Sequence, residues 1–472
     1  MKSWLIIAIL LIGTFVVRLY KIDIPIADWH SWRQADTAAV ARNFVEDGFH
    51  LFRPTYDDLS SLQTGRPNPQ GLRLVEFPLY NAMIGLVYLI TGVNEMSARL
   101  VSVLFATTST FLLYLLIRRL MTERVAVLSA AFYAFLPYNI YFTRSIFPEV
   151  PAVTFLLAAY LAFAYWMEVK KKSSLWIFGV LSTVLGAVAL LVKPTTIFFF
   201  LPFVWFAWKK YEWSMIRRLE LWTSGLTMVL PLVLWRWWIS HFPEGIPASE
   251  WLLNGQNIRF TGAFFRWIFA ERFGKLIMTG WGMPLFILGL IRGRLKDDLF
   301  PYALLVGTLL YVTVFAMGNI QHDYYQILII PTLAIFLGRG ADFLLSPPPS
   351  LSKVWTMPIL AVCLVAIAAF GWYEIRGNYQ INHWEIVEAG RAVDQLTPKD
   401  AKVIAPYFGD TAFLYQTKRK GWPIMDSPID TLIARGATHY VSVQFDDVTK
   451  QLMQKYPIVT QTEKYIILDL NP

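Results

Sequence analysis

Residues 28–37 have the sequence Asp-Trp-His-Ser-Trp-Arg-Gln-Ala-Asp-Thr and directly follow the first apolar segment of the chain. They open a long polar stretch that ends at Glu76-Phe77-Pro78-Leu79-Tyr80, and most of the chain from there to residue 375 is apolar. Two carboxylates, a histidine, an arginine and two indoles therefore stand beside a hydrophobic segment. This pattern predicts chemistry at a membrane surface.

The composition is that of a polytopic membrane protein. Of the 472 residues, 56% are hydrophobic and only 16% are charged, whereas soluble proteins carry roughly 25% charged residues. The single cysteine, Cys363, lies in an apolar run, which excludes an intrachain disulfide framework and a cysteine-based metal site. The net charge of +9 comes from Lys/Arg clusters in short loops between apolar runs, so we expect no nucleic-acid partner.

Eleven apolar segments approach the ~20 residues that a transmembrane helix needs. Their basic connecting loops lie near residues 118–124, 170–172, 209–218 and 292–296. With these loops inside, the positive-inside rule predicts a cytoplasmic N-terminus and an outer C-terminus. The expected helices are residues 3–20, 97–117, 125–142, 151–167, 174–192, 195–209, 221–239, 275–291, 299–317, 324–338 and 354–373.

Residues 78–93 are apolar but short for a span. If they crossed the membrane, every later basic loop would move outside, so we expect a juxtamembrane helix on the outer face. The first outer loop then covers residues 21–96, within a membrane domain of residues 1–375. Residues 240–274 form a second outer loop, which is either a lid over a site or an interfacial helix with aromatic anchors.

The composition becomes that of a soluble protein after Trp372. Periodicity predicts helices at 384–397, 409–417, 427–435 and 446–455, with strands at 402–407, 438–443 and 465–470. We therefore expect a small extracytoplasmic α/β domain over residues 376–472. It contains no catalytic motif.

Glu149 is the most conspicuous charged residue among the apolar segments, since it stands between Pro148 and Pro151. A charge at membrane depth costs roughly 2.5–3.5 kcal/mol and is a functional candidate. One interpretation is a carboxylate that faces an outer cavity and binds a cation or substrate. The other is a carboxylate at a helix start, paired with Arg144 and favoured by the helix dipole.

Asp28 and Asp36 are the candidate general bases of the first loop. They are eight residues apart, so one continuous helix would place both on one face, and a carboxylate can accept a proton from a hydroxyl within hydrogen-bond reach. The alternatives are a solvated acidic loop or, for Asp36, a helix cap before the periodic stretch that starts at Ala38.

Further polar residues fall at the outer ends of the expected helices. Glu76 with His30 or His322 is a candidate site for a divalent cation. Lys193 and Arg236 would suit a phosphate, with snorkelling as the alternative. The sequence has no P-loop, dinucleotide-binding glycine motif or HExxH motif, so we expect no nucleotide cofactor.

Four segments together resemble the GT-C membrane glycosyltransferases, and more closely glycosyltransferase family 39, which includes protein O-mannosyltransferases and aminoarabinose transferases. Trp32 to Asn43 resembles the first-loop acidic motif and the helix after it. Glu76 to Tyr80 is similar to the family's His/Lys-Pro-Pro-Leu motif, where the chain returns to the membrane. Arg144 to Pro151 is similar to the family's Arg-x-x-x-x-Asp-x-Pro segment. His322 to Pro331, with Leu337-Gly338, resembles the Tyr-x-x-x-x-x-Pro span. The resemblance covers about residues 1–345.

The chain departs from the family pattern at the presumed acids. The family's Asp-Glu pair falls in register with Arg33-Gln34, with Asp36 just after it and Asp28 before it. Glu149 stands where the family has Asp, and Glu76-Phe77 replaces a basic residue and a proline.

The resemblance implies transfer of a sugar from a polyprenyl phosphate to a protein, lipid or glycan acceptor outside the cytoplasmic membrane, with inversion. Asp36 or Asp28 would be the base, and Glu149 would belong to the catalytic site. The donor phosphate would be bound by Lys193, Arg236, Arg144 and Arg33, with or without a divalent cation. The cavity would be lined by Trp32, Glu76, Tyr80 and Tyr324.

Two other classes of protein fit parts of the sequence. A transporter or flippase for lipid-linked saccharides would have discontinuous helices and charges near the midplane in two matching halves, but the charges gather at one face and no duplication is found. A sensory or structural membrane protein would act through its outer α/β domain, which lacks a motif.

Overall fold

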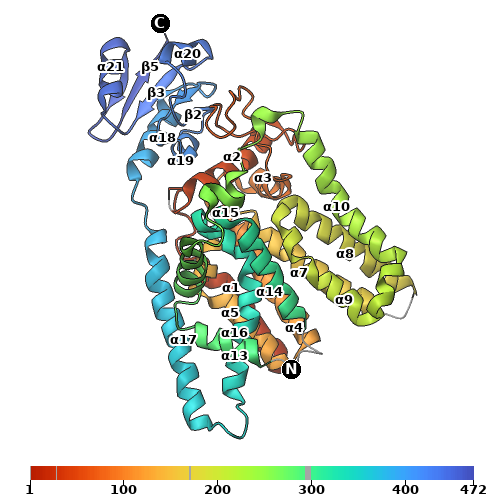
Figure 1. The fold of residues 1–472 in the computed structure, drawn as a ribbon. Helices are drawn as coiled ribbons and strands as arrows, with labels where there is room; N and C mark the ends of the chain where they lie inside the picture. The colour runs from red at the N-terminus through yellow and green to blue at the C-terminus, as the bar shows by residue number, and fades with distance from the viewer. Residues whose placement is uncertain (1, 28, 169–171, 293–298, 472) are drawn as a thin grey trace. The chain divides into compact units, whose positions relative to one another are not determined.

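The computed structural model describes residues 2–27, 29–168, 172–292 and 299–471, which are mostly helical with five short strands near the C-terminus (Figure 1). The chain forms two compact units. We call them the helical unit (residues 1–20, 100–235 and 249–377) and the sheet unit (residues 21–99, 236–248 and 378–472). The sheet unit thus combines the first polar loop with the C-terminal residues.

The helical unit is built from apolar helices joined by short segments. One of them, α4 (Glu95–Leu120), begins in the sheet unit, and α10 (Leu219–Ile239) ends there. Five short pieces, several of them 3-10 or π turns, lie between α10 and α13. The other elements are α1 (Lys2–Val17), α5 (Glu123–Phe135), α6 (Pro137–Phe142), α7 (Glu149–Glu168), α8 (Lys172–Val192), η1 (Pro194–Phe199), α9 (Leu201–Tyr211), η2 (Glu212–Arg217), η3 (Pro243–Gly245, in the sheet unit), α11 (Trp251–Asn254), η4 (Gly255–Asn257), α12 (Gly262–Phe265), η5 (Arg266–Ile277), α13 (Met283–Ile291), α14 (Leu299–Val314), α15 (Ala316–Gln321), η6 (Asp323–Ile329), α16 (Ile330–Leu345) and α17 (Lys353–Ile375).

In the described part of the chain, four helical stretches are long and apolar enough to cross a membrane: Glu95–Leu120, Glu149–Glu168, Asp323–Leu345 and Lys353–Leu396. Shorter apolar helices accompany them, including Trp4–Val17 and Leu299–Val314. The eleven crossings and their orientation remain predictions, whereas the prediction of a bundle of apolar helices is confirmed.

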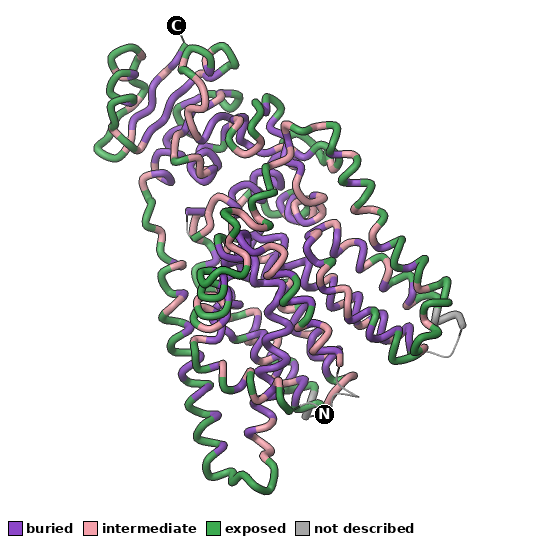
Figure 2. Tube along the Cα trace, viewed as in Figure 1, coloured by how far each residue is buried: buried purple, intermediate pink, exposed green. Residues whose placement is uncertain are grey.

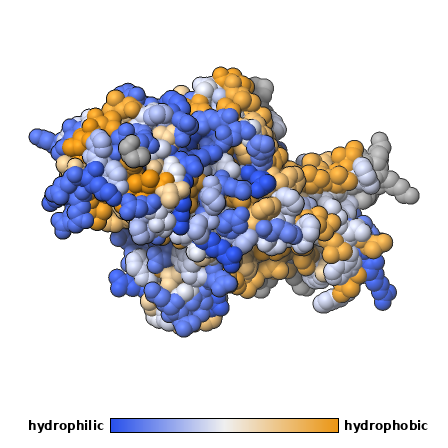
Figure 3. All heavy atoms as spheres, turned by 90° about the horizontal axis from the view of Figure 1, so that it is seen from above, coloured by the Kyte–Doolittle hydropathy of each residue, from blue (hydrophilic) through white to orange (hydrophobic). Residues whose placement is uncertain are grey.

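Burial differs sharply between neighbouring helices of the bundle. Figure 2 shows α16 buried along its length and α17 exposed along most of its own. The exposed side chains are large and apolar, among them Trp176, Leu219, Leu226 and Val354. Figure 3 shows hydrophobic side chains exposed over wide areas of the surface. Such a surface suits lipid rather than water.

Several predicted spans are interrupted, so the prediction of single continuous helices is wrong there. Residues 125–142 divide into α5 and α6 at Leu136, which is extended (φ −57°, ψ 121°) because Pro137 follows it. Lys193, extended before Pro194, lies between two predicted spans, but the second of them starts as the 3-10 turn η1 and α9 begins only at Leu201. Within 275–291, Thr279 and Gly280 have positive φ and separate η5 from α13.

Two glycines allow α13 and α16 to approach closely. A Cβ atom on Gly340 would lie 1.8 Å from the carbonyl oxygen of Leu285, and one on Gly289 would lie 1.9 Å from that of Phe336. Small residues at such crossings let apolar helices pack backbone to backbone. This contact fixes the end of α13 against α16.

The sheet unit contains a five-stranded mixed sheet in the order β2-β1-β3-β5-β4. β1 (Val403–Ile404) pairs in parallel with β2 (Gly421–Trp422) and β3 (His439–Ser442). β5 (Ile466–Asp469) is antiparallel to β3 and to β4 (Ile458–Gln461). Strands were predicted around β1, β3 and β5, but β2 and β4 were not predicted. The helices are α18 (Trp384–Leu396), α19 (Thr411–Gln416), α20 (Ile429–Ala434) and α21 (Asp447–Lys455), and η7 (Arg376–Tyr379) precedes them.

The first polar loop is part of this sheet unit. It contains α2 (Ser31–Asp47) and α3 (Leu79–Thr91), which pack together, and α19 packs against α2. Asp58 forms a parallel bridge with Gly421, the Leu59 amide donates to the Gly421 carbonyl (2.7 Å), and the Gly421 amide donates to the Asp57 carbonyl (2.8 Å). The loop therefore extends the β2 edge of the sheet.

Candidate functional site

Helix α2 carries the acidic motif of the first loop. It begins at Ser31, after His30 in the left-handed region (φ 55°). The prediction that Asp36 caps a helix is therefore wrong, since Asp36 lies inside α2. The prediction that one helix carries both acids is not met, because α2 begins after Asp28, which lies outside the described residues.

Asp36 is a buried anchor of the sheet unit. Its side chain is almost fully enclosed (2% exposed). One carboxylate oxygen lies 2.8 Å from the Arg73 guanidinium, and the other accepts a hydrogen bond from the Thr411 hydroxyl (2.6 Å). Asp36 thus ties α2 to the loop behind it and to α19. We call Arg33, Asp36, Arg73, Glu76 and Thr411 the loop cluster.

A second acid, Asp410, stands next to the loop cluster. Its carboxylate accepts the Ala412 amide proton (2.7 Å) and so caps α19, and it lies 3.4 Å from the Ser31 hydroxyl. The pKa of Asp410 is raised to about 6, mainly by burial and also by the nearby charge of Asp36, against the lowering effect of the hydrogen bond from the Ala412 amide. Asp410 therefore takes up a proton at a higher pH than an ordinary aspartate does.

Glu76 forms an ion pair with Arg33. The Arg33 guanidinium donates to both Glu76 oxygens at 2.8 Å, a fork geometry that matches a carboxylate. Both side chains are nearly buried. Arg33 therefore already has an anionic partner within the loop cluster, and the pairing of Glu76 with His30 or His322 stays a prediction.

Metal binding by Glu76, His30 and His322 stays a prediction. No group of three or more His, Cys, Asp or Glu side chains in the described parts of the chain is placed to hold one. The His30 ring lies against Trp29, and the His322 ring is near Trp251, Tyr324 and Tyr325. We therefore assign no step to a metal at these residues.

The helical unit contains a buried ion pair at the start of α7. Glu149 is the first residue of α7 and is completely buried, and its carboxylate lies 2.6 Å from the Lys193 ammonium. Lys193 follows the end of α8, which packs along α7. Glu149 lies at a helix start, as the second interpretation predicts, and the cation 2.6 Å from its carboxylate is Lys193.

Tyr325 lies beside this pair, and we group the pair with nearby charged and aromatic residues of the helical unit as the bundle cluster. Its members are Arg144, Glu149, Lys193, Asp323, Tyr324 and Tyr325. The Lys193 ammonium lies 4.9 Å from the centre of the Tyr325 ring, and Tyr324 stacks on Phe147 with ring centres 4.6 Å apart. Arg144 is buried beside Tyr141. Asp323 lies 3.7 Å from Arg272, and its carbonyl accepts the Tyr138 hydroxyl proton.

The remaining candidates are placed as follows. Tyr80 is buried in α3, and Trp32 is partly exposed in α2. Arg236 is exposed near the end of α10. The structure thus brings Arg33 together with Glu76, and Glu149 together with Lys193. The convergence of all candidates on one site remains a prediction.

Sequence reasoning missed Arg73, Thr411 and Asp410. Arg73 is 37 positions from Asp36 and Thr411 is 375 positions away, so no periodicity connects them. The first loop offers other arginines, such as Arg53 and Arg66. Nothing local in the sequence indicates which of them binds Asp36.

In each cluster, a nearly buried cation pairs with a carboxylate: Arg33 with Glu76, and Lys193 with Glu149. A substrate phosphate that reaches Lys193 would have to share it with Glu149, and one that reaches Arg33 would have to share it with Glu76. Such pairs keep a cation in place and fully charged, which suits stabilisation of a leaving phosphate.

Comparison with known proteins adds two findings. The family model described as dolichyl-phosphate-mannose-protein mannosyltransferase matches residues 75–238, about a third of the chain. No curated protein sequence gives a significant match.

Solved structures resemble the whole chain. ArnT from Cupriavidus metallidurans bound to undecaprenyl phosphate has a TM-score of 0.69 at 14% identity, over 98% of this chain and 97% of ArnT. Its apo form gives the same score. The oligosaccharyltransferase of Archaeoglobus fulgidus, in complex with Zn and sulfate, has a TM-score of 0.56 at 12% identity, over 93% of this chain and 67% of that protein.

These likenesses confirm the resemblance that the sequence motifs indicate. The matched family segment includes Glu76, Glu149 and Lys193. The chain therefore has the fold of the GT-C membrane glycosyltransferases.

Proposed function

We propose that this protein is a membrane glycosyltransferase that moves a sugar from a polyprenyl phosphate to an acceptor hydroxyl at the outer face of the cytoplasmic membrane. The observation that carries the proposal is the likeness to ArnT over nearly the full length of both chains, because that structure is bound to undecaprenyl phosphate. The match to the mannosyltransferase family over residues 75–238 supports the same reaction class.

The apolar helices suit a lipid-linked donor. An isoprenoid chain needs a hydrophobic environment, and the exposed side chains of α8, α10 and α17 supply apolar surface. Such a donor carries its own leaving group, a phosphate. The transferase then needs no nucleotide site, in agreement with the missing nucleotide-binding motifs.

In the proposed reaction, the acceptor oxygen attacks the anomeric carbon on the face opposite the phosphate. The new C–O bond forms as the bond between the anomeric carbon and the phosphate oxygen breaks, and the configuration inverts. The acceptor proton passes to a carboxylate of the first loop, and the polyprenyl phosphate leaves with the bonding electrons.

We assign the leaving phosphate to Lys193, with Arg144 beside it. Glu149 then has a positioning role, because it holds the Lys193 ammonium at 2.6 Å in a buried setting. Arg33 and Arg236 are the candidates for a second phosphate contact. A cation placed where negative charge develops is typically worth several kcal/mol of transition-state stabilisation.

We assign the base to Asp28 in preference to Asp36. Both oxygens of Asp36 are engaged, one by Arg73 and one by Thr411, and the side chain is 2% exposed. A base must reach the acceptor hydroxyl, and Asp36 would have to give up both partners to do so.

The test is a transfer assay with purified protein and a radiolabelled polyprenyl-phosphate sugar. Asp28→Asn and Lys193→Met are each expected to lower kcat by at least about 100-fold, the typical effect of losing a base or a charge stabiliser. Asp23→Asn, an exposed acid five residues before Asp28, is the matched control and should retain activity.

Folding is checked in parallel by the elution profile and thermal unfolding of each variant. Full transfer by folded Asp28→Asn would remove Asp28 as the base. Translocation of the labelled lipid across vesicles without any transfer would overturn the proposed reaction and favour a flippase.

A further inference from the structure

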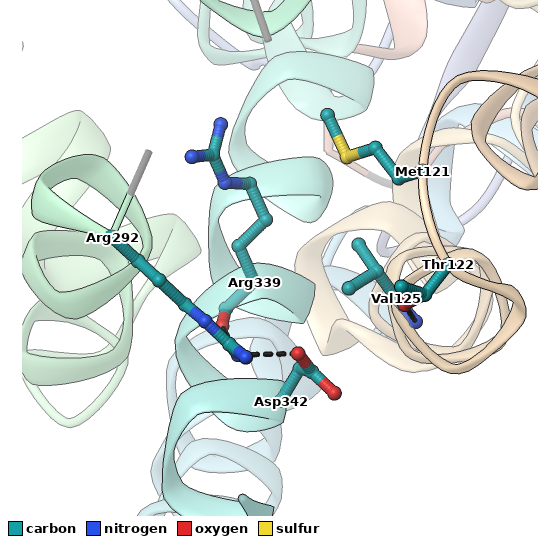
Figure 4. A pocket seen from close by; sticks show the side chains of 6 residues that line it. All are labelled: Met121, Thr122, Val125, Arg292, Arg339 and Asp342. Atoms are coloured by element: carbon teal, nitrogen blue, oxygen red, sulfur yellow. Dashed lines mark hydrogen bonds and ion pairs between the residues drawn. The ribbon is translucent and has the colours of Figure 1, made fainter. Parts of the chain in front are cut away.

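The helical unit contains a charged pocket that none of the proposed steps uses. Its volume is about 210 Å³, far more than the ~10–15 Å³ that a single water molecule needs. It is lined by Met121, Thr122, Val125, Arg292, Arg339 and Asp342. Figure 4 shows Arg292 and Arg339 extending from α13 and α16, with Met121 and Val125 on the opposite wall.

Two arginines and one aspartate are the charged residues among the described lining of this pocket. The Asp342 carboxylate is almost buried and forms ion pairs with both Arg292 and Arg124. Arg339 is also nearly buried (4% exposed) and packs its guanidinium near the rings of Tyr302 and Phe336. Arg292 and Arg339 thus both line the pocket, and Asp342 forms ion pairs with Arg292 and with Arg124.

The pocket lies at the end of the bundle opposite Glu149. Glu149 begins α7 and Glu168 ends it, and Glu168 pairs with Arg119, which is two residues before the lining residue Met121. Twenty helical residues rise about 30 Å, which matches the hydrophobic thickness of a bilayer. The pocket is thus separated from the bundle cluster by about the thickness of a membrane.

From these observations we infer that the pocket binds a phosphate group, as carried by the head group of an anionic phospholipid in the leaflet remote from Glu149. Guanidinium forks match phosphate oxygens in geometry and charge. Basic pockets between membrane helices are known sites for anionic head groups. Arg292 and Arg339 would bind the phosphate.

Asp342 has two opposing effects in this arrangement. Its pairs with Arg124 and Arg292 hold those guanidiniums at the pocket, while its own charge repels an anion. Replacing Asp342 by asparagine removes the repulsion and keeps a hydrogen-bond acceptor. Phosphate binding should then become tighter, provided that the helices stay in place.

A purely structural ion-pair network makes different predictions. It would lose thermal stability when any member is replaced, but no variant would change the affinity for an anion. The distinguishing measurement is therefore ligand binding by folded protein and not stability.

The experiment is a titration of the delipidated full-length protein in detergent, read by native mass spectrometry. The probes are short-chain phosphatidic acid, phosphatidylcholine of equal chain length and inorganic phosphate. The variants are Arg292→Gln and Arg339→Gln, with the exposed Arg217→Gln of η2 as the matched control, and Asp342→Asn.

We expect phosphatidic acid to bind at least tenfold more tightly than phosphatidylcholine. Arg292→Gln and Arg339→Gln should each weaken binding about tenfold, Asp342→Asn should tighten it several-fold, and Arg217→Gln should have no effect. Arg292 is partly exposed, so its variant keeps the test valid if Arg339→Gln does not fold.

The probes identify the source of the phosphate. Arginine-dependent binding of inorganic phosphate with equal affinity would support a free phosphate ligand, and preference for phosphatidic acid would support a lipid head group. Equal binding of phosphatidylcholine, or identical affinities for Arg292→Gln and Arg217→Gln, would overturn the inference.

Discussion

The contact between Thr411 and Asp36 gives a sharp prediction about the sheet unit. Replacing Thr411 by valine keeps the shape of the side chain and removes the hydroxyl that donates to Asp36 at 2.6 Å. Both residues are buried, so water cannot replace the lost bond. One oxygen of a buried carboxylate then lacks its donor, while Arg73 still holds the other oxygen.

The size of the effect follows from the charge on Asp36. A hydrogen bond to a charged group contributes roughly 1.5–3 kcal/mol. We therefore expect Thr411→Val to lower the free energy that holds α19 against α2 by about 2 kcal/mol. Local opening of α19 should become about 30-fold more frequent, since 1.4 kcal/mol is a factor of ten.

Amide hydrogen exchange measures this opening residue by residue. The amides of α19 should exchange about 30-fold faster in Thr411→Val than in the wild type, whereas those of the buried strand β3 should change less. Thr431→Val in α20 is the matched control, because Thr431 is exposed. If the amides of α19 exchange at the same rate in both variants, Asp36 does not anchor α19. Asp36 would then again be a candidate for the base.

Three further predictions concern other buried contacts. Lys193→Met should lower the free energy of unfolding by roughly 3–5 kcal/mol because it leaves the Glu149 charge unpaired. Adding Glu149→Gln should restore most of the thermal stability. A double variant as unstable as the single one would contradict this. The pKa of Asp410 is about 6 in the folded protein, whereas its ordinary value is 3.8. As the pH falls from 7 to about 4, the folded state therefore takes up the proton before the unfolded state does, and the stability of the protein rises. Asp410→Asn should flatten that part of a plot of Tm against pH. Gly340→Ala should lower stability by about 1–3 kcal/mol through the clash with Leu285, whereas Gly225→Ala, with no atom within 4 Å of the new Cβ, should leave Tm unchanged in the same scan.

Local patterns made much of the fold predictable. Long apolar runs predicted α4, α7 and α17 because a helix in lipid satisfies its own backbone hydrogen bonds. Alternation and β-branched residues predicted the strands around β1, β3 and β5. β2 has only two residues, Gly421 and Trp422, too few to produce a periodic signal.

The candidate site was predictable in residue type but not in pairing. Glu149 and Lys193 were both conspicuous because charges are costly among apolar helices, yet only the antiparallel packing of α7 and α8 brings them together. The ion pair of Glu76 with Arg33, which lies 43 positions earlier, was not predicted because chain order does not indicate distance in space.

The bridge between Asp58 and Gly421 also constrains the order of events during synthesis. Residues 57–59 find their backbone partner only after residue 421 has been made. At about 5–20 residues per second, this delay is on the order of 20–70 s. Until then the first loop lacks its backbone partner in the sheet while the helices after it are made. The last fifty residues of the chain therefore decide when one of its earliest segments becomes native.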